Sequence, residues 1–360
     1  MKAINLILPN DISEISAGKN RILSYINVLK KQYEINLITF SKNRNIKIEE
    51  VNLYLINYIK VEKNNFFKRT FDEIKLSYKL VLLSNKIKSD VTLLTIPSMF
   101  LLPIGLFIKT KKIVDIRDIQ WEYLNNKFIK QILKVIMLNS LKFYDKITVT
   151  NEYELKYLEN YNPILISNGI SQNQFEKLQT LHINPKEFSV TYIGNIGIAQ
   201  DLIILCKVAK KLPLIKFKLI GDGVEFKRLQ NYIKENNIKN IEMPGKMDWE
   251  EIKKEYQKSS VLFAKLNENF AMAMPSKLYE YASIGLPIIY IGEGQAREFV
   301  ENLENSYVIE DNEEELVKIL QKLKTKKFKI SQKNIKFIKD NYIREEQSLK
   351  LINILQRIEK

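Results

Sequence analysis

Short apolar runs rich in β-branched residues alternate with longer helix-like stretches along the whole chain, and this alternation limits the fold more than any other feature. The runs at residues 3–8, 35–40 and 189–193 show little alternation of apolar and polar positions, as expected of strands buried on both faces of a parallel sheet. Helical patterns lie between such runs, for example at residues 19–31 and 201–211. Repeated strand–helix units predict an α/β fold built from doubly wound parallel sheets.

The chain has 360 residues, a length that favours two domains over one. The strand–helix pattern pauses at Asn168-Gly169 and resumes at Ser189. Two α/β halves joined there would face each other across a cleft with the carboxyl ends of their strands, where open α/β sheets bind ligands. We therefore expect an N-terminal Rossmann-like domain at 1–170, a linker at 171–187, a C-terminal Rossmann-like domain at 188–333, and a helical segment at 334–360 that packs back on the N-terminal domain.

The rare residue types exclude several classes of site. The chain has one cysteine, Cys206, and one histidine, His182, so a disulfide framework, a cysteine metal cluster and a site that needs two histidines are excluded. The N-terminus runs directly into a strand-like segment without the pattern of a signal peptide. The longest apolar candidate, 91–108, is interrupted by prolines and does not suit a bilayer span. We expect a cytoplasmic protein.

The formal net charge is +15, and the excess lies mainly in the first half of the chain. A basic surface suggests a polyanionic partner such as nucleic acid, an anionic membrane or a phosphorylated substrate. A composition rich in Lys, Ile and Asn that merely follows biased codon usage explains the charge equally well. The chain shows no basic–aromatic recognition motif for nucleic acid, and we do not expect nucleic acid as a partner.

Two glycine-rich turns in the second half follow predicted strands. Gly194 and Gly197 come after the strand at 189–193 and before a helix that we expect from about Asp201. Glycine permits close approach of the backbone, and the free N–H groups of a helix start bind anions such as a pyrophosphate. Gly221-Asp222-Gly223 follows the next strand, where a tight turn can lie beside a nucleotide base, although Asp222 also suits a plain turn or a helix cap.

The segment from Pro275 to Glu280 is the most informative part of the sequence. Pro275 is suited to begin a helix, with Ser276 and Lys277 in its first turn. A lysine near the positive end of a helix is unfavourable unless an anion binds beside it. Glu280 follows one turn later on the same face as Ser276, where a carboxylate can accept both hydroxyl groups of a ribose. The alternative interpretation is a solvated Lys and Glu on a surface helix.

These three segments, in this order, resemble retaining glycosyltransferases of the GT-B fold, specifically glycosyltransferase family 4. The resemblance covers nearly the whole chain and is strongest over residues 190–290. It implies that the first turn meets the donor diphosphate, that the Gly-Asp-Gly turn lies near the base, and that Glu280, the late glutamate of an E-x7-E motif, binds the ribose. The donor-binding residues that we expect are Gly18, Gly194, Asn195, Gly197, Gly221, Asp222, Gly223, Lys265, Ser276, Lys277, Leu278 and Glu280.

The sequence departs from the family pattern at two points. Met272 stands where the early glutamate of E-x7-E normally contacts the donor sugar. Asn195 and Gln200 lie where the family usually has an Arg and a Lys, so we expect Lys265 and Lys277 to replace the missing positive charge. This variant is similar to a subgroup that builds bacterial surface polysaccharides such as capsule and O-antigen. Some of its members transfer N-acetylated amino or deoxyamino sugars, including N-acetylfucosamine.

The first half fits the same resemblance. Gly18 follows the first strand, where the family has a glycine loop that faces donor and acceptor. The segment from Asp115 to Asp118 resembles the family's D-x-R-D sequence, and Asn168-Gly169 its N-G step. We expect Arg117 to hold a phosphate and Asp118 to orient the acceptor hydroxyl or act as a base. The alternative for these residues is an internal Asp–Arg ion pair.

The resemblance implies a transfer with retention of anomeric configuration and without an assigned enzymatic nucleophile. The expected donor is a nucleotide sugar, with UDP as the favoured nucleotide, and the expected acceptor is a lipid-linked saccharide. We see no Asp-x-Asp motif and expect neither a metal nor another cofactor. Positioning and electrostatic stabilisation of the leaving phosphate would supply most of the rate.

Two stretches, 66–71 and 127–146, combine basic and apolar residues. Such amphipathic segments suit the surface of an anionic bilayer, on the inner face of the plasma membrane, but they also suit ordinary core-facing helices. Two other functions stay open. One is a non-catalytic GT-B subunit that supports an active transferase, which the loss of the glutamate at Met272 favours. The other is a nucleotide-sugar epimerase, for which we locate no acid/base residues.

Overall fold

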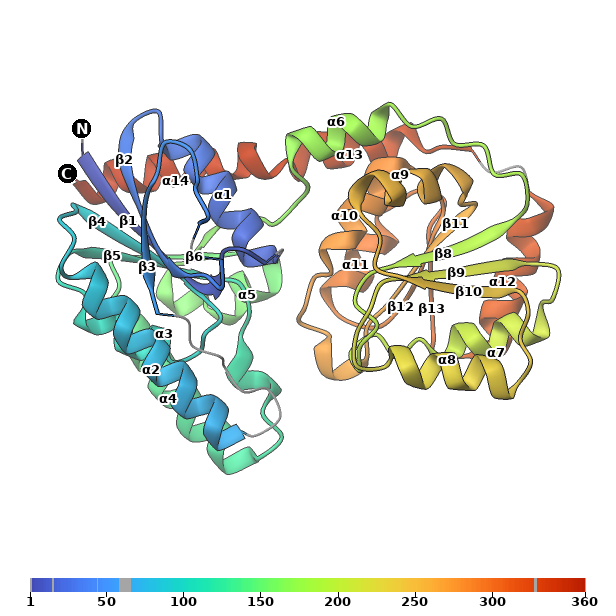
Figure 1. Ribbon diagram of the computed structural model, residues 1–360, viewed down its shortest axis with the longest axis horizontal. Coiled ribbons are helices and arrows are strands. Elements are labelled where there is room, and N and C mark those ends of the chain that lie inside the picture. Colours follow the sequence, from blue (N-terminus) through green and yellow to red (C-terminus); the bar gives the residue numbers. More distant parts are fainter. Residues whose placement is uncertain (1, 15, 44, 58–65, 327–328, 360) are drawn as a thin grey trace. The chain divides into compact units, whose positions relative to one another are not determined.

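The structure is a computed structural model that describes residues 2–14, 16–43, 45–57, 66–326 and 329–359. The chain forms two compact units, one comprising Met1–Asn168 with Arg344–Lys360 and the other comprising Gly169–Ile343 (Figure 1). The chain therefore passes from one unit to the other twice, once after Asn168 and once after Ile343.

The first unit is built on a parallel sheet whose strand order is β3-β2-β1-β4-β5-β6-β7 in the described residues. All of its strand pairs are parallel, as the continuous apolar runs predict. The strands are β1 (Lys2–Asp11), β2 (Tyr33–Phe40), β3 (Asn52–Ile56), β4 (Val91–Ile96), β5 (Lys111–Ile116), β6 (Lys146–Val149) and β7 (Ile164–Leu165).

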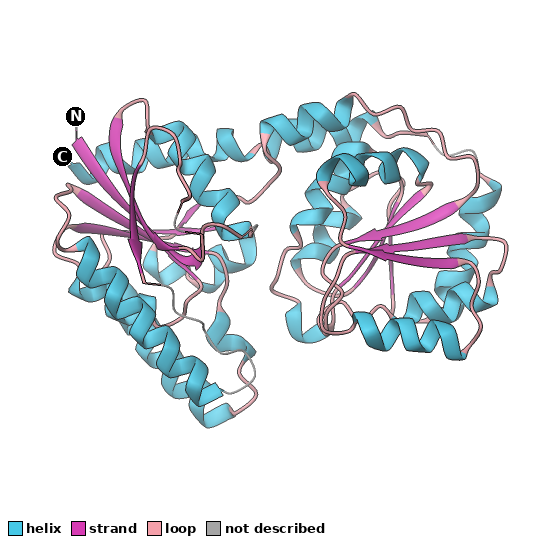
Figure 2. Ribbon diagram, in the orientation of Figure 1, coloured by secondary structure: helices cyan, strands magenta, loops and turns pink. Residues whose placement is uncertain are grey.

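Helices cover both faces of this sheet (Figure 2). Successive strand residues point to opposite faces, so Leu6 packs with the helices α1 and α14 while Ile7 packs with α2, α3 and α4. The helices of the unit are α1 (Ala17–Leu29), α2 (Phe66–Ser84), α3 (Leu101–Ile104), α4 (Lys127–Leu141), α5 (Glu152–Tyr157) and α14 (Arg344–Glu359), with short 3₁₀ turns η1 (Gly105–Phe107), η2 (Gln120–Tyr123) and η3 (Glu159–Tyr161).

The second unit repeats this architecture with the strand order β10-β9-β8-β11-β12-β13, which is the doubly wound order of a Rossmann fold. Its described strand pairs are also all parallel. The strands are β8 (Ser189–Ile193), β9 (Lys216–Ile220), β10 (Ile241–Gly245), β11 (Val261–Lys265), β12 (Ile288–Ile291) and β13 (Tyr307–Ile309).

Two apolar layers sandwich the second sheet. On β11, Phe263 packs with α7, α8 and α12, whereas its neighbours Leu262 and Ala264 pack with the helices of the other face. The helices are α6 (Gln172–Gln179), α7 (Ile203–Lys211), α8 (Phe226–Glu235), α9 (Trp249–Lys258), α10 (Ser276–Ile284), α11 (Gln295–Glu301), α12 (Glu313–Thr325) and α13 (Gln332–Asn341), with the 3₁₀ turn η4 (Glu268–Phe270).

Two boundaries differ from those expected from the sequence. The segment 171–187 is not a free linker, because it contains α6, which buries Phe175 and Leu178 in the core of the second unit. The segment 334–360 does not belong to the first unit as a whole either. Its first part is α13 in the second unit, and only α14 packs on α1 in the first. The division falls beside Tyr342, whose carbonyl accepts the N–H of Ile170 at 3.0 Å.

Candidate functional site

The strand order of the second unit reverses between β8 and β11, and ligands of open α/β sheets bind at the carboxyl ends of strands at such a point. The parallel register pairs Leu262 with Thr191 and Ile220 with Ile193. The residues that follow these strands, Gly194 and Gly221, therefore leave the sheet side by side, and Lys265 ends β11 at the same level. The structure thus brings three of the predicted donor-binding segments to one edge.

The two glycine-rich turns are packed directly on each other. Gly221 has a φ of +144°, and a Cβ there would lie 1.8 Å from the carbonyl oxygen of Gly194. At Gly223 a Cβ would lie 2.3 Å from the carbonyl oxygen of Ile196, whose N–H donates to the carbonyl of Asp222 at 2.9 Å. These glycines are required by the close approach of the two loops. Asp222 is exposed, and its carboxylate accepts the N–H of Gly223 at 2.8 Å.

The first glycine turn is longer than the sequence predicts. Asn195 donates from its side-chain amide to Gln200 at 3.1 Å, so the two residues that replace the family's cations bind each other. Asp201 adopts a φ of +33°, which is not helical, and α7 begins only at Ile203. The expectation of a helix from about Asp201 is therefore wrong by two residues, and the helix start lies that much further from Gly194.

Lys265 lies at the predicted edge, but its charge already has partners. Its side chain is 3% exposed, and its Nζ lies 2.8 Å from Asp311 Oδ2 and 3.5 Å from Asp201 Oδ2. A buried cation needs such partners, because removal from water disfavours an isolated charge. Lys265 can therefore meet a phosphate only by exchanging a carboxylate for it.

The helix α10 begins where the sequence predicts, after Pro275. Ser276 is exposed at its first position. Leu278 is fully buried in the core, and its N–H donates to the carbonyl of Pro275 at 3.0 Å. Its side chain and its N–H therefore both serve the fold, and the donor contact expected of Leu278 stays a prediction.

Lys277 and Glu280 form an ion pair one turn apart on α10. The Nζ of Lys277 donates to both carboxylate oxygens of Glu280, at 2.9 and 3.0 Å. The buried phenol of Tyr256 donates to the Oε1 of the same carboxylate. The side chains of Lys277 and Glu280 are 29% and 11% exposed, so the two groups predicted to meet phosphate and ribose lie together and remain reachable from solvent.

A third glycine turn at this edge was missed from the sequence. Gly292 and Gly294, which follow β12, have φ values of +144° and +74°. A Cβ on them would collide with the carbonyl oxygens of Leu266 and Ala271 at 2.7 and 2.0 Å. The turn therefore supports the loop that carries Met272, which is half-buried. The signal was the Gly-Glu-Gly sequence directly after an apolar run.

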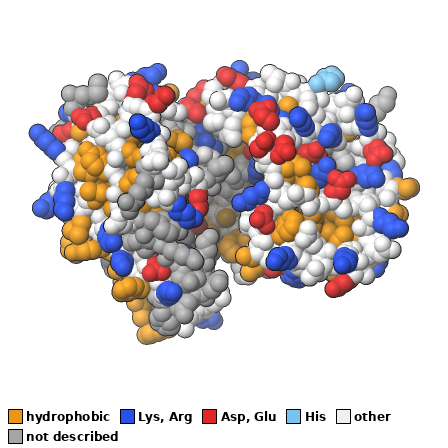
Figure 3. Space-filling view, viewed as in Figure 1, with side chains coloured by type: hydrophobic (Ala, Val, Ile, Leu, Met, Phe, Trp, Pro, Cys, Tyr) orange, Lys and Arg blue, Asp and Glu red, His pale blue; other side chains and the backbone are white. Residues whose placement is uncertain are grey.

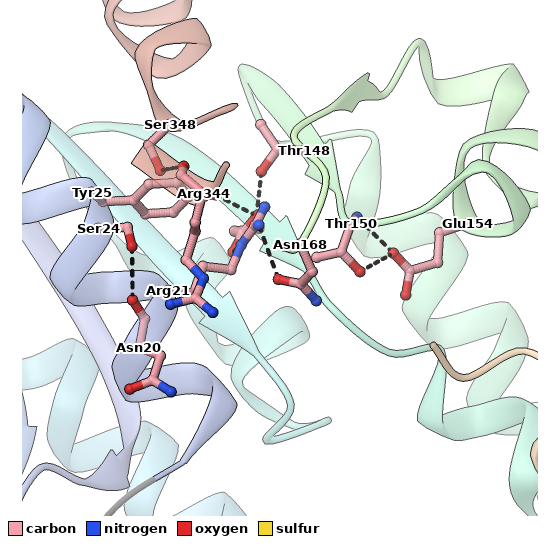
Figure 4. Close-up of polar contacts among 11 residues, drawn as sticks. Asn20, Arg21, Ser24, Tyr25, Thr148, Thr150, Glu154, Asn168, Arg344 and Ser348 are labelled. Atoms are coloured by element: carbon pink, nitrogen blue, oxygen red, sulfur yellow. Dashed lines mark hydrogen bonds and ion pairs between the residues drawn. The ribbon is translucent and has the colours of Figure 1, made fainter. Parts of the chain in front are cut away.

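In the first unit, the corresponding edge is organised by a buried ion pair (Figure 4). The guanidinium of Arg21, on α1, donates two hydrogen bonds of 2.8 Å to the carboxylate of Asp115, on β5. Thr148 on β6 and Tyr25 donate to the same carboxylate at 2.7 and 3.1 Å. Arg21 also donates to the side-chain oxygen of Asn168 at 3.3 Å. The pair thereby ties α1, two strands and the last residue before the chain leaves the unit.

Both members of this pair are almost completely buried, with 1% and 0% of their side chains exposed. Burial alone would raise the pKa of Asp115, but the charge and hydrogen bonds of Arg21 outweigh it and lower that pKa. The alternative interpretation of an internal Asp–Arg pair concerned Arg117 and Asp118, whereas the buried Asp–Arg pair of the structure joins Asp115 with Arg21. The sequence signal was a lone arginine among the apolar residues of an amphipathic helix.

Arg117 lies beside the start of α1 and is not part of an ion pair of the described residues. A Cβ on Gly18 would lie 2.8 Å from Arg117 Nη2 and equally close to Asn10 Oδ1, so the glycine is required by these neighbours. Arg117 Nε and Asn10 Oδ1 are buried without a hydrogen-bond partner. Burial lowers the pKa of Arg117, although the charge of Asp115 acts against this. A cation in this state can bind an anion strongly.

Asp118 and Glu154 are neighbouring carboxyl groups at the same edge. Burial raises the pKa of Asp118, against the effect of a hydrogen bond from the phenol of Tyr123. Burial also raises the pKa of Glu154 to about 8, although the N–H and hydroxyl of Thr150 donate to it, and the charge of Asp118 contributes to the increase. The sequence did not single out Glu154 as part of a site.

The structure shows two further properties. In the described ranges, no group of three or more His, Cys, Asp or Glu side chains comes together as a ligand set for a metal ion, and His182 is exposed. None of the described helices combines the length and the apolar character that crossing a bilayer requires.

Comparisons with solved structures identify the fold. The chain is similar to the sucrose-phosphate synthase of Thermosynechococcus elongatus, with a TM-score of 0.78 and 14% identity over 99% of each chain. It is also similar to HepE of Anabaena in complex with UDP and glucose, with a TM-score of 0.71 and 14% identity over 99% of this chain and 100% of the other. The two parallel-sheet units are those of the GT-B fold.

Sequence comparisons give the class. Residues 173–342, almost the whole second unit, match the family model described as glycosyl transferases group 1. An uncharacterized glycosyltransferase of Haemophilus influenzae is 24% identical over 88% of this chain and 89% of its own length. One of Methanocaldococcus jannaschii is 25% identical over 49% of this chain, and the match spans about half, 52%, of that relative.

The fold and these matches define a glycosyltransferase of the GT-B fold. The match to the model of glycosyl transferases group 1 falls on the second unit, which has the glycine turns and the Lys277–Glu280 pair at the carboxyl edge of its sheet.

The packing of the glycine turns generates a prediction for Gly221→Ala. The added Cβ would collide with a backbone oxygen, so we expect the free energy of unfolding to fall by more than about 3 kcal/mol. The matched control is Gly245→Ala, because Gly245 has a φ of +88° but nothing within 4 Å of its Cβ position. That variant should lose only the conformational cost of about 1–2 kcal/mol. Urea unfolding measures both, and equal losses would contradict the packing argument.

The buried ion pair generates a second prediction. Arg21→Met leaves the charge of Asp115 buried without its partner, so we expect a loss of about 3–5 kcal/mol in the free energy of unfolding. The control is Lys336→Met, which breaks an ion pair with Asp340 whose side chains are 75% and 47% exposed, and should cost less than about 1 kcal/mol. A small loss in both variants would show that the Arg21–Asp115 pair is dispensable.

Proposed function

We propose that the protein transfers a sugar from a nucleotide diphosphate, with UDP as the nucleotide, to a lipid-linked saccharide acceptor with retention of configuration. The proposed setting is the synthesis of bacterial surface polysaccharide, such as capsule or O-antigen, by a family 4 enzyme in the cytoplasm. An N-acetylated amino or deoxyamino sugar of the N-acetylfucosamine type is the proposed donor sugar. No metal or other cofactor takes part in the proposed reaction.

The observation that carries this proposal is the pairing of Lys277 with Glu280 beside the glycine turns of the second unit. A nucleoside diphosphate can bind both members of the pair, because its phosphate accepts hydrogen bonds from the ammonium group of Lys277 and its ribose hydroxyls donate to the carboxylate of Glu280. In the first turn the N–H groups of Gly194 and Ile196 donate to the carbonyls of Ile220 and Asp222, so the proposed donors for the diphosphate are the other N–H groups of this turn and those at the start of α10. Ser276, exposed at that helix start, supplies a further hydroxyl.

The Gly-Asp-Gly turn is the proposed neighbour of the base. Its backbone is fixed against the first turn by the contact between Gly221 and Gly194, so it offers a rigid edge for a flat ligand. UDP is favoured as the nucleotide because HepE of Anabaena, which shares the fold, is known in complex with UDP and glucose. At the Met272 position a thioether stands where a carboxylate would contact the sugar, which favours a sugar with an apolar or acetylated substituent.

The proposed acceptor side lies on the first unit. Arg117 is half-buried, its buried Nε has no hydrogen-bond partner, and it is the proposed holder of a phosphate. Asp118, whose pKa burial raises, is the proposed group that orients the acceptor hydroxyl or takes its proton. As the bond between the anomeric carbon and the leaving phosphate breaks, negative charge grows on that phosphate. Lys277 and the helix start of α10 stabilise this charge.

A lipid-linked acceptor is supported by an apolar–basic face on the first unit. The exposed large hydrophobic residues that define it lie on α2, on α4 and next to these helices, and they are Phe71, Ile74, Tyr78, Leu82, Phe107, Phe128, Ile132, Val135, Ile136 and Phe143. Phe128, Ile132 and Ile136 form a single stripe at helical spacing. The short helix α3 packs against both α2 and α4, so the exposed residues of α2 and the stripe on α4 belong to one layer of helices.

Exposed basic side chains lie among these residues, namely Lys75, Lys86, Lys109, Lys127 and Lys142, and Figure 3 shows hydrophobic and basic side chains together on the lower part of this unit. Extended apolar patches on monomeric proteins usually mark a site of interaction with another protein, a ligand or a membrane. The combination suits a bilayer with anionic lipids, where the apolar groups insert and the lysines meet the headgroups. The side chains of Phe66 and Phe67, also predicted to take part, lie outside the described residues.

A second candidate function is a non-catalytic GT-B subunit that supports an active transferase. The observation that favours it is Met272 in place of the glutamate that normally contacts the sugar. Hydrolysis and transfer assays with a panel of nucleotide sugars, with and without a lipid-linked acceptor, separate the two. Binding of UDP without turnover of any donor would favour the non-catalytic subunit, and turnover only with an acceptor would favour the transferase over an epimerase.

The ribose role generates a prediction for Glu280→Gln. The amide still accepts from Tyr256 but loses the charge that pairs with Lys277 and binds two hydroxyls, so we expect UDP affinity to fall by about tenfold to a hundredfold. Isothermal titration calorimetry with UDP measures the change. The control is Glu235→Gln, because Glu235 is exposed at the end of α8 that lies away from the Gly-Asp-Gly turn. Equal affinities for UDP in the two variants would contradict the role of Glu280.

The apolar–basic face generates a prediction for the double variant Phe128→Asp, Ile132→Asp. We expect the wild-type protein to sediment with phosphatidylglycerol vesicles at moderate salt. The double variant should bind at least about a hundredfold more weakly, because each of the two inserted side chains contributes about 1.5–3 kcal/mol. Leu214→Asp is the control, since Leu214 is 82% exposed on the second unit. Absence of binding by the wild-type protein would exclude the membrane proposal.

A further inference from the structure

Glu154 is a buried carboxyl group beside the proposed acceptor residues, and the proposed reaction does not use it. It lies on α5 and is 2% exposed. Asn151 caps the helix by accepting the N–H of Glu154 at 2.8 Å. The position of the side chain is therefore fixed by the fold, and a buried carboxyl group in such a place is costly unless it is neutral or paired.

The pairing of β5 with β6 explains why Glu154 and Asp118 lie at one edge. Ile116 and Val149 are partners at the ends of these strands, so Asp118 and the Thr150-Asn151 turn leave the sheet at the same level. The phenol of Tyr123 acts to lower the pKa of Asp118, and Tyr123 lies within electrostatic reach of both carboxyl groups.

Glu154 receives only neutral donors. Its Oε2 accepts the N–H of Thr150 at 2.7 Å and the hydroxyl of the same residue at 2.9 Å. The ion pairs of the described residues include none with Glu154. The charged or titratable groups that face it are Asp118, Tyr123 and Arg21, and the guanidinium of Arg21 is bound to Asp115 through two hydrogen bonds.

Two carboxyl groups so placed cannot both ionise without mutual repulsion in a buried setting. Asp118 is the carboxyl group that keeps the charge, because it is only half-buried and both Tyr123 and the charge of Arg117 act to lower its pKa. Glu154 is the more deeply buried of the two and lacks a cation of its own. The proton therefore belongs on Glu154.

We infer that Glu154 is a positioning residue of the acceptor side, which stays protonated at neutral pH and thereby leaves Asp118 as the single carboxylate of this edge. This inference rests on the proposed function of Asp118. When Glu154 ionises, the second buried negative charge repels Asp118 and displaces it from the place where it meets the acceptor hydroxyl. Nucleotide binding on the second unit does not depend on this charge.

The test is the pH dependence of kcat/KM for the acceptor in the full chain, compared between wild type and Glu154→Gln. The pKa of about 8 leaves Glu154 about one-tenth protonated at pH 9. We therefore expect kcat/KM of the wild type to fall about tenfold between pH 7 and pH 9. The amide stays neutral and accepts the same two hydrogen bonds from Thr150. The variant should accordingly keep kcat/KM within about threefold of wild type at pH 7, with less than a twofold fall to pH 9.

UDP affinity, measured by calorimetry, is the control for this experiment and should not change between pH 7 and pH 9 in either protein. An alkaline loss of kcat/KM that is the same in wild type and Glu154→Gln would overturn the inference. An alkaline loss of UDP affinity in the wild type that Glu154→Gln abolishes would also overturn it, because the effect would then not lie on the acceptor side.

Thermal unfolding gives a readout that does not require turnover. A carboxyl group whose pKa is raised in the folded state stabilises the fold below its ordinary pKa, and this stability is lost as the pH rises through the folded value. The Tm of the wild type should therefore fall relative to that of Glu154→Gln between pH 5 and pH 8. Asp118→Asn removes the repelling charge and should make that fall smaller. Parallel Tm curves for all three proteins would overturn the inference. If the Tm values change with pH as expected but no sugar is transferred, the result would count against the proposed function alone.

Discussion

Parallel pairing of the strands is the constraint on which the rest of the structure depends. In every described strand pair of both sheets the strands run in the same direction, so each strand must be followed by a crossover and all carboxyl ends meet at one edge. Segments far apart in sequence, such as those after β8, β9, β11 and β12, thereby become neighbours. Their backbones approach so closely that side chains no longer fit, and Gly221, Gly223, Gly292 and Gly294 are the result.

The same edge of each sheet carries buried charge, but the two units use it differently. In the first unit, Arg21 and Asp115 satisfy each other completely and hold the strands and α1 in place. The half-buried Arg117 takes part in no ion pair of the described residues and leaves its Nε without a hydrogen-bond partner. The charges of Asp115 and Asp118 act on its pKa, but an anion bound beside it would suit it better.

The sequence predicts the α/β architecture, the two glycine turns and the start of α10 at Pro275, because each depends on local patterns of apolar residues, glycine and proline. It does not predict which charges pair. Lys265 binds Asp311, and Arg21 binds Asp115, across 46 and 94 residues of chain, and only the folded sheet brings these residues together. The helix α6 was missed because its eight residues carry few apolar positions and depend on burial of Phe175 and Leu178.

The pairing of Lys277 with Glu280 bears on the kind of ligand that the second unit can bind. Inorganic phosphate would bind Lys277 alone, and the carboxylate of Glu280, which is 11% exposed, would keep only the phenol of Tyr256 as its partner. A nucleoside would bind Glu280 alone and leave Lys277 without an anion. Either exchange gives up a charged hydrogen bond. In the proposed function, a nucleoside diphosphate replaces both partners in one event, which is why we propose a ligand that carries ribose and phosphate in a single molecule.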